Sequence, residues 1–152
     1  MCKPMNIYEA RLDDALLETL VALSADWEAE NSTYGYRKNE RSDIEPNRIF
    51  LAEEDGGILG YLFGHAARAE RASSVMEAQT PYFEIKEIYV RPEHRGAGVG
   101  RALFRFAEQR AGEEGFDYVM LTTATKDYRK ILHFYIDELG MDIWSARLFK
   151  KL

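Results

Sequence analysis

The sequence predicts an α/β fold in which a mixed central sheet is flanked by helices. Segments with the alternating apolar pattern of strands are interspersed with segments of helical periodicity, in the order strand, helix, hairpin, strand, helix, strand, helix, strand. The chain has 152 residues and is 46% hydrophobic, which is enough for a core of ordinary size. We therefore expect residues 1–152 to form a single domain.

The first half of the chain begins with a strand and a helix. Residues 5–10 alternate as a strand does, and the next helix is indicated by leucines at helical spacing, Leu12, Leu16, Leu20 and Leu23. Residues 27–48 are polar and aromatic without a clear period, which suits a broken helix or a mobile lid. Residues 48–54 and 58–67 flank Asp55-Gly56-Gly57, which supplies the positive φ angles of a tight turn, so these segments should pair antiparallel.

The second half alternates strands and helices. Residues 82–90, YFEIKEIYV, are rich in aromatic and β-branched residues and predict a strand. Beyond a glycine-rich loop, a helix is indicated by residues that share one face, Val99, Leu103, Phe106 and Ala107. Residues 118–125 predict a strand, residues 128–139 a helix that stops at Gly140, and residues 142–151 a last strand.

Composition limits the class of protein. The net charge of −6 argues against a nucleic-acid partner and favours an amine or another cation. Cys2 is the only cysteine, and the histidines lack ligand spacing, so we expect neither an internal disulfide nor a metal site. No apolar run suits a signal peptide or a membrane span, so we expect a cytoplasmic protein that does not bind membranes.

The segment RPEHRGAGVGRALFRF, residues 91–106, predicts a phosphate site. A strand that turns through Gly96, Gly98 and Gly100 into a helix directs several backbone N–H groups and the positive end of the helix dipole toward one point. The segment lacks the Gly-Lys-Ser/Thr of a P-loop. Counted from Gly96, the sixth position is Arg101 and not the glycine of a dinucleotide fingerprint. The alternative is a plain flexible turn between strand and helix.

This segment resembles the coenzyme A signature of the GNAT superfamily of N-acetyltransferases, Arg/Gln-x-x-Gly-x-Gly/Ala after a strand that ends in Val-x-Pro. Arg95, Gly98 and Gly100 match the signature, and Val90-Arg91-Pro92 precedes it at the expected distance. Downstream, ILHFYIDELGM resembles a later helix of the family, with Tyr135 at its tyrosine position. The resemblance covers most of residues 48–141 and implies a mixed, mostly antiparallel sheet.

Two departures from the family pattern affect the expected site and assembly. Tyr128 stands where the family often has an asparagine near the start of the tyrosine helix, which puts one coenzyme contact in doubt. Only twelve residues follow Gly140, which suits one strand better than a full terminal hairpin. We therefore expect a homodimer in which a partner subunit completes the edge of the sheet.

The resemblance implies direct transfer of an acetyl group from acetyl-CoA, the cosubstrate, to an amine. Only about one alkyl amine in 2,500 is neutral at pH 7, so the acceptor needs a base. Family members that use a strand glutamate carry it on the face shared by Glu84, which is the predicted base. Glu87, expected on the opposite face, is the second candidate. Tyr135 is the predicted acid that protonates the departing thiolate.

Coenzyme and acceptor residues follow from the same resemblance. The coenzyme would be bound by the end of the strand, the loop and the later helix: Ile88, Tyr89, Val90, Arg95, Gly96, Ala97, Gly98, Val99, Gly100, Arg101 and Tyr128. The acceptor pocket would include Trp27, Glu28, Tyr34 and Tyr36, because aromatic rings and carboxylates suit a cationic amine.

The identity of the acceptor stays open at this stage. A small cationic acceptor such as a polyamine, an aminoglycoside or an amino-acid derivative is expected, and a protein N-terminal or lysine amine is the alternative acceptor. A non-catalytic acyl-CoA sensor and a nucleotide-binding regulatory module are competing functions. The first would bind coenzyme A without releasing thiol in the presence of amines, and the second would bind ATP or NAD.

Overall fold

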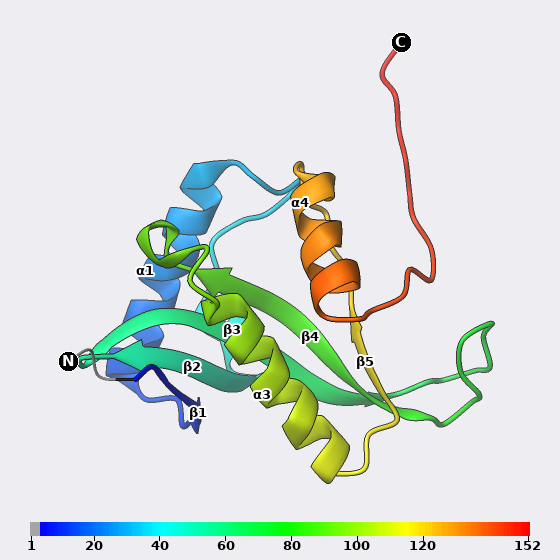
Figure 1. The fold of residues 1–152 in the computed structure, drawn as a ribbon, viewed down its shortest axis with the longest axis horizontal. Helices are drawn as coiled ribbons and strands as arrows, with labels where there is room; N and C mark the ends of the chain where they lie inside the picture. Colours follow the sequence, from blue (N-terminus) through cyan, green and yellow to red (C-terminus); the bar gives the residue numbers. More distant parts are fainter. Residues whose placement is uncertain (1–3) are drawn as a thin grey trace.

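The computed structural model of the protein describes residues 4–152. Its elements are β1 (Asn6–Ala10), α1 (Asp14–Glu30), α2 (Arg41–Ile44), β2 (Arg48–Glu54), β3 (Gly57–Arg68), β4 (Pro81–Val90), the short helix η1 (Pro92–His94), α3 (Val99–Glu113), β5 (Tyr118–Leu121), α4 (Tyr128–Leu132) and the π-helix η2 (His133–Glu138) (Figure 1). The strands form a five-stranded sheet in the order β1-β2-β3-β4-β5. All neighbours are antiparallel except β4 and β5, which confirms the predicted fold class.

The β2–β3 hairpin forms where the sequence predicts it. Asp55 and Gly56 have φ angles of 51° and 79°, the positive values that a tight turn between two twisted strands requires. The flanking segments pair antiparallel from Arg48 opposite Gly64 to Glu54 opposite Gly57. This hairpin forms the middle of the sheet, on which both helical layers pack.

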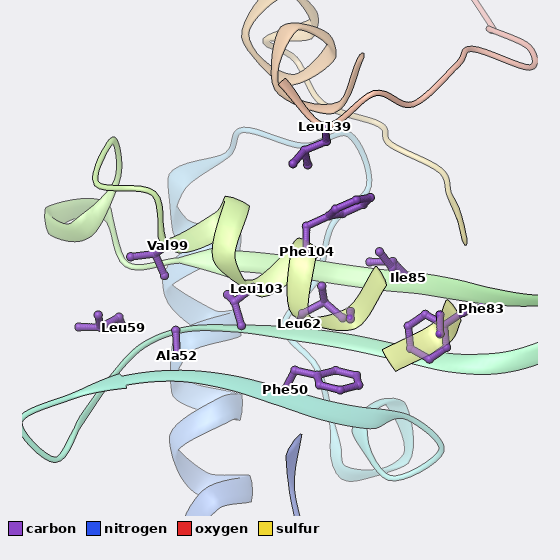
Figure 2. Close-up of a cluster of buried hydrophobic side chains, with 12 residues drawn as sticks. Phe50, Ala52, Leu59, Leu62, Phe83, Ile85, Val99, Leu103, Phe104 and Leu139 are labelled. Atoms are coloured by element: carbon purple, nitrogen blue, oxygen red, sulfur yellow. The ribbon is translucent and has the colours of Figure 1, made fainter. Parts of the chain in front are cut away.

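Helices cover both faces of the sheet. One face packs against α3, whose buried residues Val99, Leu103 and Phe104 belong to one cluster with Leu62 and Phe83 of the sheet (Figure 2). The other face packs against α1, through a cluster that contains Leu20, Leu23, Ile49, Leu51, Tyr61, Phe63 and Tyr89. The helix formed by α4 and η2 lies on the α3 side, where Leu139 joins the same core. Each side of the sheet therefore has its own hydrophobic core.

A β-bulge in β4 changes which side chains face which helix. Phe63 of β3 lies opposite Glu87, but the next residue of β3, Gly64, lies opposite Ile85, so Lys86 is an extra residue in the ladder. Phe83 and Ile85 before the bulge and Ile88 and Val90 after it all pack on the α3 side. The strand therefore keeps its apolar residues on one face although the period-2 pattern shifts by one.

The end of the chain corrects one prediction. Residues 142–151 form no strand, and the backbone of this segment makes no hydrogen bond to the backbone of other described residues. Figure 1 shows it extending away from the body of the molecule after η2. The predicted strand at residues 118–125 is also shorter than expected, because β5 ends at Leu121. No helix within residues 4–152 is long and apolar enough to cross a membrane.

Candidate active site

The glycine-rich loop between β4 and α3 has the geometry of an anion site. Gly98 is the N-cap of α3 with a φ of 85°, and Gly96 has a φ of 80°. No side chain caps this end of the helix, so its first N–H groups are free to bind a ligand. A Cβ atom on either glycine would meet no heavy atom within 4 Å, so the space above the loop is open. The loop therefore has the geometry to bind an anion such as a phosphate.

Gly100 has a different role, because its backbone is helical. A Cβ atom there would lie 3.3 Å from Cζ of Phe134 and 3.7 Å from Cγ2 of Val90. The start of α3, the π-helix η2 and the end of β4 thus meet at this residue. Its lack of a side chain lets η2 approach the strand at the position where the coenzyme arm is predicted to pass.

The second half of β4 has an open edge. The pairing of β4 with β5 runs from Tyr82 opposite Tyr118 only to Ile85 opposite Leu121. Residues 87–90 pair with β3 on one side, and no described strand lies on their other side. Figure 1 shows β5 diverging from β4 beyond this point. Backbone groups of Ile88 and Tyr89 are thus in a strand segment that can pair with an extended ligand.

Arg95, the first residue of the coenzyme signature, is held by α1. Its guanidinium donates to both carboxylate oxygens of Glu30, over 2.6 and 3.0 Å, and its Nε donates to the carbonyl of Val90. It also lies over the ring of Tyr89, 5.3 Å from the centroid. The hydrogen bonds from Arg95 lower the pKa of Glu30 below its usual range. Arg95 thus links the coenzyme loop to the last residue of α1.

Glu87 is the centre of a polar network on the α1 side of β4. Its Oε2 accepts hydrogen bonds from Tyr61 Oη at 2.9 Å, Asn39 Nδ2 at 3.0 Å and Tyr36 Oη at 3.2 Å. Burial raises the pKa of Glu87 above its usual range, and the three hydrogen bonds oppose this shift. A carboxylate with a raised pKa is a stronger base than an exposed one.

The second oxygen of Glu87 is left for another partner. All three donors contact Oε2, and no described residue donates to Oε1. Every buried side-chain oxygen or nitrogen in residues 4–152 has a hydrogen-bond partner. Because Oε1 of Glu87 has none, it is accessible to solvent. One oxygen of Glu87 is therefore fixed by the protein while the other can meet an ammonium group or a water molecule.

Glu84 lies on the same face as Glu87, which corrects the predicted arrangement. The extra residue Lys86 shifts the alternation, so the expectation that the two glutamates point to opposite faces was wrong. Glu84 lies 3.3 Å from Nζ of Lys86 and 3.5 Å from Nε2 of His65, and its side chain is 30% exposed. It is a partly solvated carboxylate beside an ammonium group and an imidazole.

Three aromatic rings form a wall next to this network. Trp27 stacks on Tyr36 with ring centroids 4.1 Å apart and on Tyr89 at 5.6 Å. The indole Nε1 of Trp27 donates to Thr33 Oγ1 at 3.2 Å. Tyr36 therefore links the wall to Glu87, and the structure brings two predicted acceptor residues, Trp27 and Tyr36, to one place.

The other two predicted acceptor residues lie farther from Glu87. Glu28 is exposed, and its carboxylate accepts from the backbone N–H of Lys38 at 2.8 Å, which fastens the loop after α1. Tyr34 is 53% exposed and has Lys126 over its ring and the ring of Phe149 beside it. Tyr34 is therefore not part of the aromatic wall that Trp27, Tyr36 and Tyr89 form.

Tyr135 and Tyr128 differ sharply in environment. Tyr135 lies in η2, where its ring is 5.1 Å from that of Phe134 and 6.4 Å from that of Phe104. Burial raises its pKa to about 12. Its hydroxyl makes no hydrogen bond within the described residues. Tyr128 is 55% exposed and stacks only with the guanidinium of Arg129.

Sequence reasoning missed part of the network around Glu87. Ser24 is fully buried in α1, and its Oγ accepts from the backbone N–H of Asn39 at 2.7 Å, which positions the amide that contacts Glu87. Tyr61 stands in the apolar run of β3, where its hydroxyl gives no sign of a polar partner. A buried asparagine in a polar loop has no sequence signature either. No group of acidic, histidine or cysteine residues in the described part of the chain is arranged to hold a metal ion.

Comparisons with known proteins agree with this geometry. Mycothiol acetyltransferase of Thermobispora bispora is 29% identical over 111 residues, which are 72% of this chain and 35% of the relative. That of Frankia casuarinae is 27% identical over 95 residues, which are 62% of this chain and 28% of the relative. The chain spans about a third of the length of these curated relatives.

Solved structures share the fold over nearly the whole chain. An aminoglycoside acetyltransferase from an uncultured soil metagenomic sample superposes with a TM-score of 0.71 at 17% identity, covering 99% of both chains. A second one, solved with sisomicin, gives a TM-score of 0.67 at 18% identity, covering 97% of this chain and 96% of that one. The sequence model described as the Acetyltransferase (GNAT) family matches residues 12–141. This chain therefore belongs to the acetyltransferase (GNAT) family, a family of acetyl-transfer enzymes.

Proposed function

We propose that this protein is an acetyl-CoA-dependent N-acetyltransferase that acts on the amine of a small cationic acceptor. The observation that carries this proposal is the position of Glu87. This partly buried carboxylate, with one oxygen free, lies on a strand whose open edge leads directly into the glycine-rich loop. One strand thereby joins the two halves of a two-substrate site.

The donor half would bind coenzyme A through backbone groups. The first N–H groups of α3 and the glycines at positive φ suit its phosphates, and the open edge of β4 from Ile88 to Val90 suits its extended arm. Arg101, which is exposed at the start of α3, adds positive charge. When bound, acetyl-CoA supplies the activated acetyl group as a thioester.

Glu87 is the proposed base. Its raised pKa and its free Oε1 suit removal of a proton from an ammonium group, directly or through one water molecule. The donors on Oε2 hold the carboxylate in place while the other oxygen accepts the proton. Glu84 is the second candidate, but Lys86 and His65 already lie beside its oxygens. The base assignment therefore moves from Glu84 to Glu87.

Tyr135 is the proposed acid. A phenol whose pKa is raised to about 12 stays protonated at neutral pH and can give its proton as negative charge develops on the departing sulfur. Gly100 lets η2 approach Val90, which brings the helix that carries Tyr135 beside the open edge of β4. Tyr128, exposed at the start of α4, would contact the coenzyme from outside.

The aromatic wall and the network of Glu87 favour a cationic acceptor. The partly exposed rings of Trp27 and Tyr36 suit contact with a cation, and Glu87 supplies negative charge next to them. The net charge of −6 attracts cations over longer distances. The fold shared with aminoglycoside acetyltransferases supports an acceptor with several amines. A protein N-terminal or lysine amine is the second candidate acceptor.

A thiol-release screen tests the proposed function. Acetyl-CoA is incubated with the protein and pooled polyamines, aminoglycosides, amino acids and peptides, and free thiol is measured. We expect release with polycationic amines and a weaker response at high salt, because salt screens the attraction. Binding of coenzyme A without thiol release in any pool would instead support an acyl-CoA sensor, and binding of ATP or NAD in its place a nucleotide-binding module.

Gly98→Val serves as the inactive variant in this screen. A branched side chain disfavours the φ of 85° and blocks approach of a phosphate to the start of α3, so coenzyme A should bind about 100-fold more weakly. Gly112→Val is its matched control, because Gly112 lies at the other end of α3 with no atom near its Cβ position. Equal affinity of both variants in calorimetry would remove the loop from the coenzyme site.

We also propose that the protein works as a homodimer in the cytoplasm. The single cysteine, which can form no internal disulfide, suits a reducing compartment. The dimer is supported by the exposed apolar residues at the end of the chain.

A further inference from the structure

Glu30 occupies an unfavourable place for an acid. It is the last residue of α1, where the free carbonyl groups of a helix carry partial negative charge, and the last turn of this helix contains no basic residue. Its side chain is nevertheless only 25% exposed. A partly buried carboxylate at this end of a helix needs donors from elsewhere in the fold. These donors come from β4 and from the glycine-rich loop that follows it.

Two residues next to the glycine-rich loop bind Glu30. The guanidinium of Arg95 donates to Oε1 at 2.6 Å and to Oε2 at 3.0 Å, and the hydroxyl of Tyr89 donates to Oε2 at 3.0 Å. The guanidinium also lies over the ring of Tyr89. A two-point contact between a guanidinium and a carboxylate fixes the direction of both groups as well as their distance. Glu30 therefore holds the side chain of Arg95 in one orientation.

The glycine-rich loop has few other contacts. None of residues 92–98 is buried, and within the described chain Arg95 is the only one of them that makes a side-chain hydrogen bond. Gly96 and Gly98 have no heavy atom within 4 Å of a Cβ position. Glycines without packing can adopt many backbone conformations. The shape of the loop thus depends on its ends, where Val99 is buried on one side and Arg95 is held on the other.

Arg95 also contacts the open edge of β4. The backbone N–H of Arg91 donates to the carbonyl of Leu59 in β3. Because neighbouring residues of a strand direct their backbone groups to opposite sides, the carbonyl of Val90 points toward the open edge. The Nε of Arg95 donates to that carbonyl at 2.8 Å. One side chain therefore joins α1, the end of β4 and the glycine-rich loop.

We propose that Glu30 is a positioning residue of the coenzyme site, which holds Arg95 so that the glycine-rich loop is already in the form that binds phosphate. This inference rests on the proposed function, in which the loop binds coenzyme A. Glu30 itself touches neither substrate. A loop that is ordered beforehand binds more tightly, because less conformational freedom is lost on binding. Glu30 thus increases the affinity for acetyl-CoA although its charge has the same sign as that of the phosphates.

The direction of the change in affinity separates this role from simple electrostatics. If charge alone mattered, loss of a carboxylate near a phosphate site would strengthen binding. Glu30→Gln should instead weaken binding of coenzyme A by about tenfold in calorimetry, because an amide cannot accept both hydrogen bonds from Arg95. Asp26→Asn removes the same charge from an exposed position one turn earlier on α1 and should not weaken binding. Unchanged or tighter binding in Glu30→Gln would overturn the inference.

A double-variant cycle tests whether Glu30 acts through Arg95. When Arg95→Gln has already removed the guanidinium, adding Glu30→Gln should change the affinity for coenzyme A by less than about twofold. A further tenfold loss would mean that Glu30 acts by another route. In steady-state kinetics, Glu30→Gln should raise KM for acetyl-CoA by about tenfold and leave kcat within about twofold of the wild type. A fall in kcat with an unchanged KM would contradict a role in positioning the loop.

Limited proteolysis tests the anchor without any ligand. Trypsin cleaves after an arginine whose guanidinium can enter its specificity pocket, and Glu30 holds the guanidinium of Arg95. Cleavage between Arg95 and Gly96 should be faster in Glu30→Gln than in the wild type. Cleavage after Arg71, which is exposed in the loop between β3 and β4, is the internal control and should be unchanged.

The two measurements together separate this inference from the proposed function. Equal cleavage at Arg95 in both proteins would overturn the role of Glu30 even when the wild type binds coenzyme A, and the proposed function would stand. A wild type that binds no coenzyme A would refute the proposed function, and with it the role of Glu30, whatever the proteolysis gives. Weaker binding together with faster cleavage in Glu30→Gln is the expected result.

Discussion

The two faces of β4 carry different kinds of side chain. The face toward α3 is apolar, with Phe83, Ile85, Ile88 and Val90 packed in one core. The face toward α1 contains Glu84, Glu87 and Tyr89 with their polar partners. In the proposed site, this strand would support the coenzyme through its apolar face and its open edge, and the acceptor through its polar face.

The bulge at Lys86 is what makes this division possible. In a regular strand, Glu84 and Glu87 would lie on opposite faces, and one of them would enter the α3 core. The extra residue returns Ile88 to the apolar face and Glu87 to the polar face. The placement of both glutamates on one face therefore depends on a single irregular residue. Four experiments test this difference between the two faces.

The largest effect is expected from Glu87→Gln. If Glu87 is the base, kcat/KM should fall by about 10² to 10⁴, with partial recovery at high pH where the acceptor amine deprotonates by itself. Glu84→Gln is the matched control on the same face and should stay within about threefold of the wild type. Both are measured as profiles of kcat/KM against pH. A large loss in Glu84→Gln alone would assign the base to the other glutamate.

Tyr135→Phe should slow acetyl transfer by about 10² in a single turnover, since it removes the proposed acid and keeps the ring that packs on Phe104. Affinity for acetyl-CoA and thermal stability should change little. Tyr128→Phe, which changes an exposed tyrosine, is the control. Normal single-turnover rates in both variants would mean that water supplies the proton.

Asn39→Ala should act through Glu87 and have a smaller effect. The amide of Asn39 stabilises the ionised carboxylate, so its removal should raise the pKa of Glu87 further. The acid limb of the kcat/KM profile should therefore move to higher pH, with a loss of about tenfold on that limb. Asn47→Ala, which loses a contact with His65 near Glu84, should leave the limb in place. If the acid limb of the kcat/KM profile is at the same pH in Asn39→Ala as in the wild type, the amide of Asn39 does not influence the pKa of Glu87.

The smallest effect concerns stability. Burial raises the pKa of Glu87 in the folded state, so the folded protein holds this proton more tightly than the unfolded chain. The resulting stability is fully present below the unfolded pKa of about 4.3 and is lost as pH rises through the raised folded value. Glu87→Gln lacks this loss, so its melting temperature relative to the wild type should rise by a few degrees over that range. A difference in melting temperature between Glu87→Gln and the wild type that does not change with pH would contradict a raised pKa of Glu87.

Local patterns in the sequence determined most of the elements and the donor loop. The β2–β3 hairpin, α3 and the loop through Gly96 and Gly98 depend on residues within a few positions of each other, and the structure has them where expected. The helix of Tyr135 is also where its periodicity predicts, although its second half is a π-helix. Such features are visible in a sequence because the energies that favour them are local.

Tertiary structure alone decided the polar face of β4 and the end of the chain. The bulge at Lys86 arises from pairing with β3, and the network of Glu87 joins Ser24, Asn39 and Tyr61 from three other segments. Residues 142–151 have the pattern of a strand but find no backbone partner among residues 4–152. A strand needs a neighbour to satisfy its hydrogen bonds, and a buried carboxylate needs donors that only the folded chain brings together.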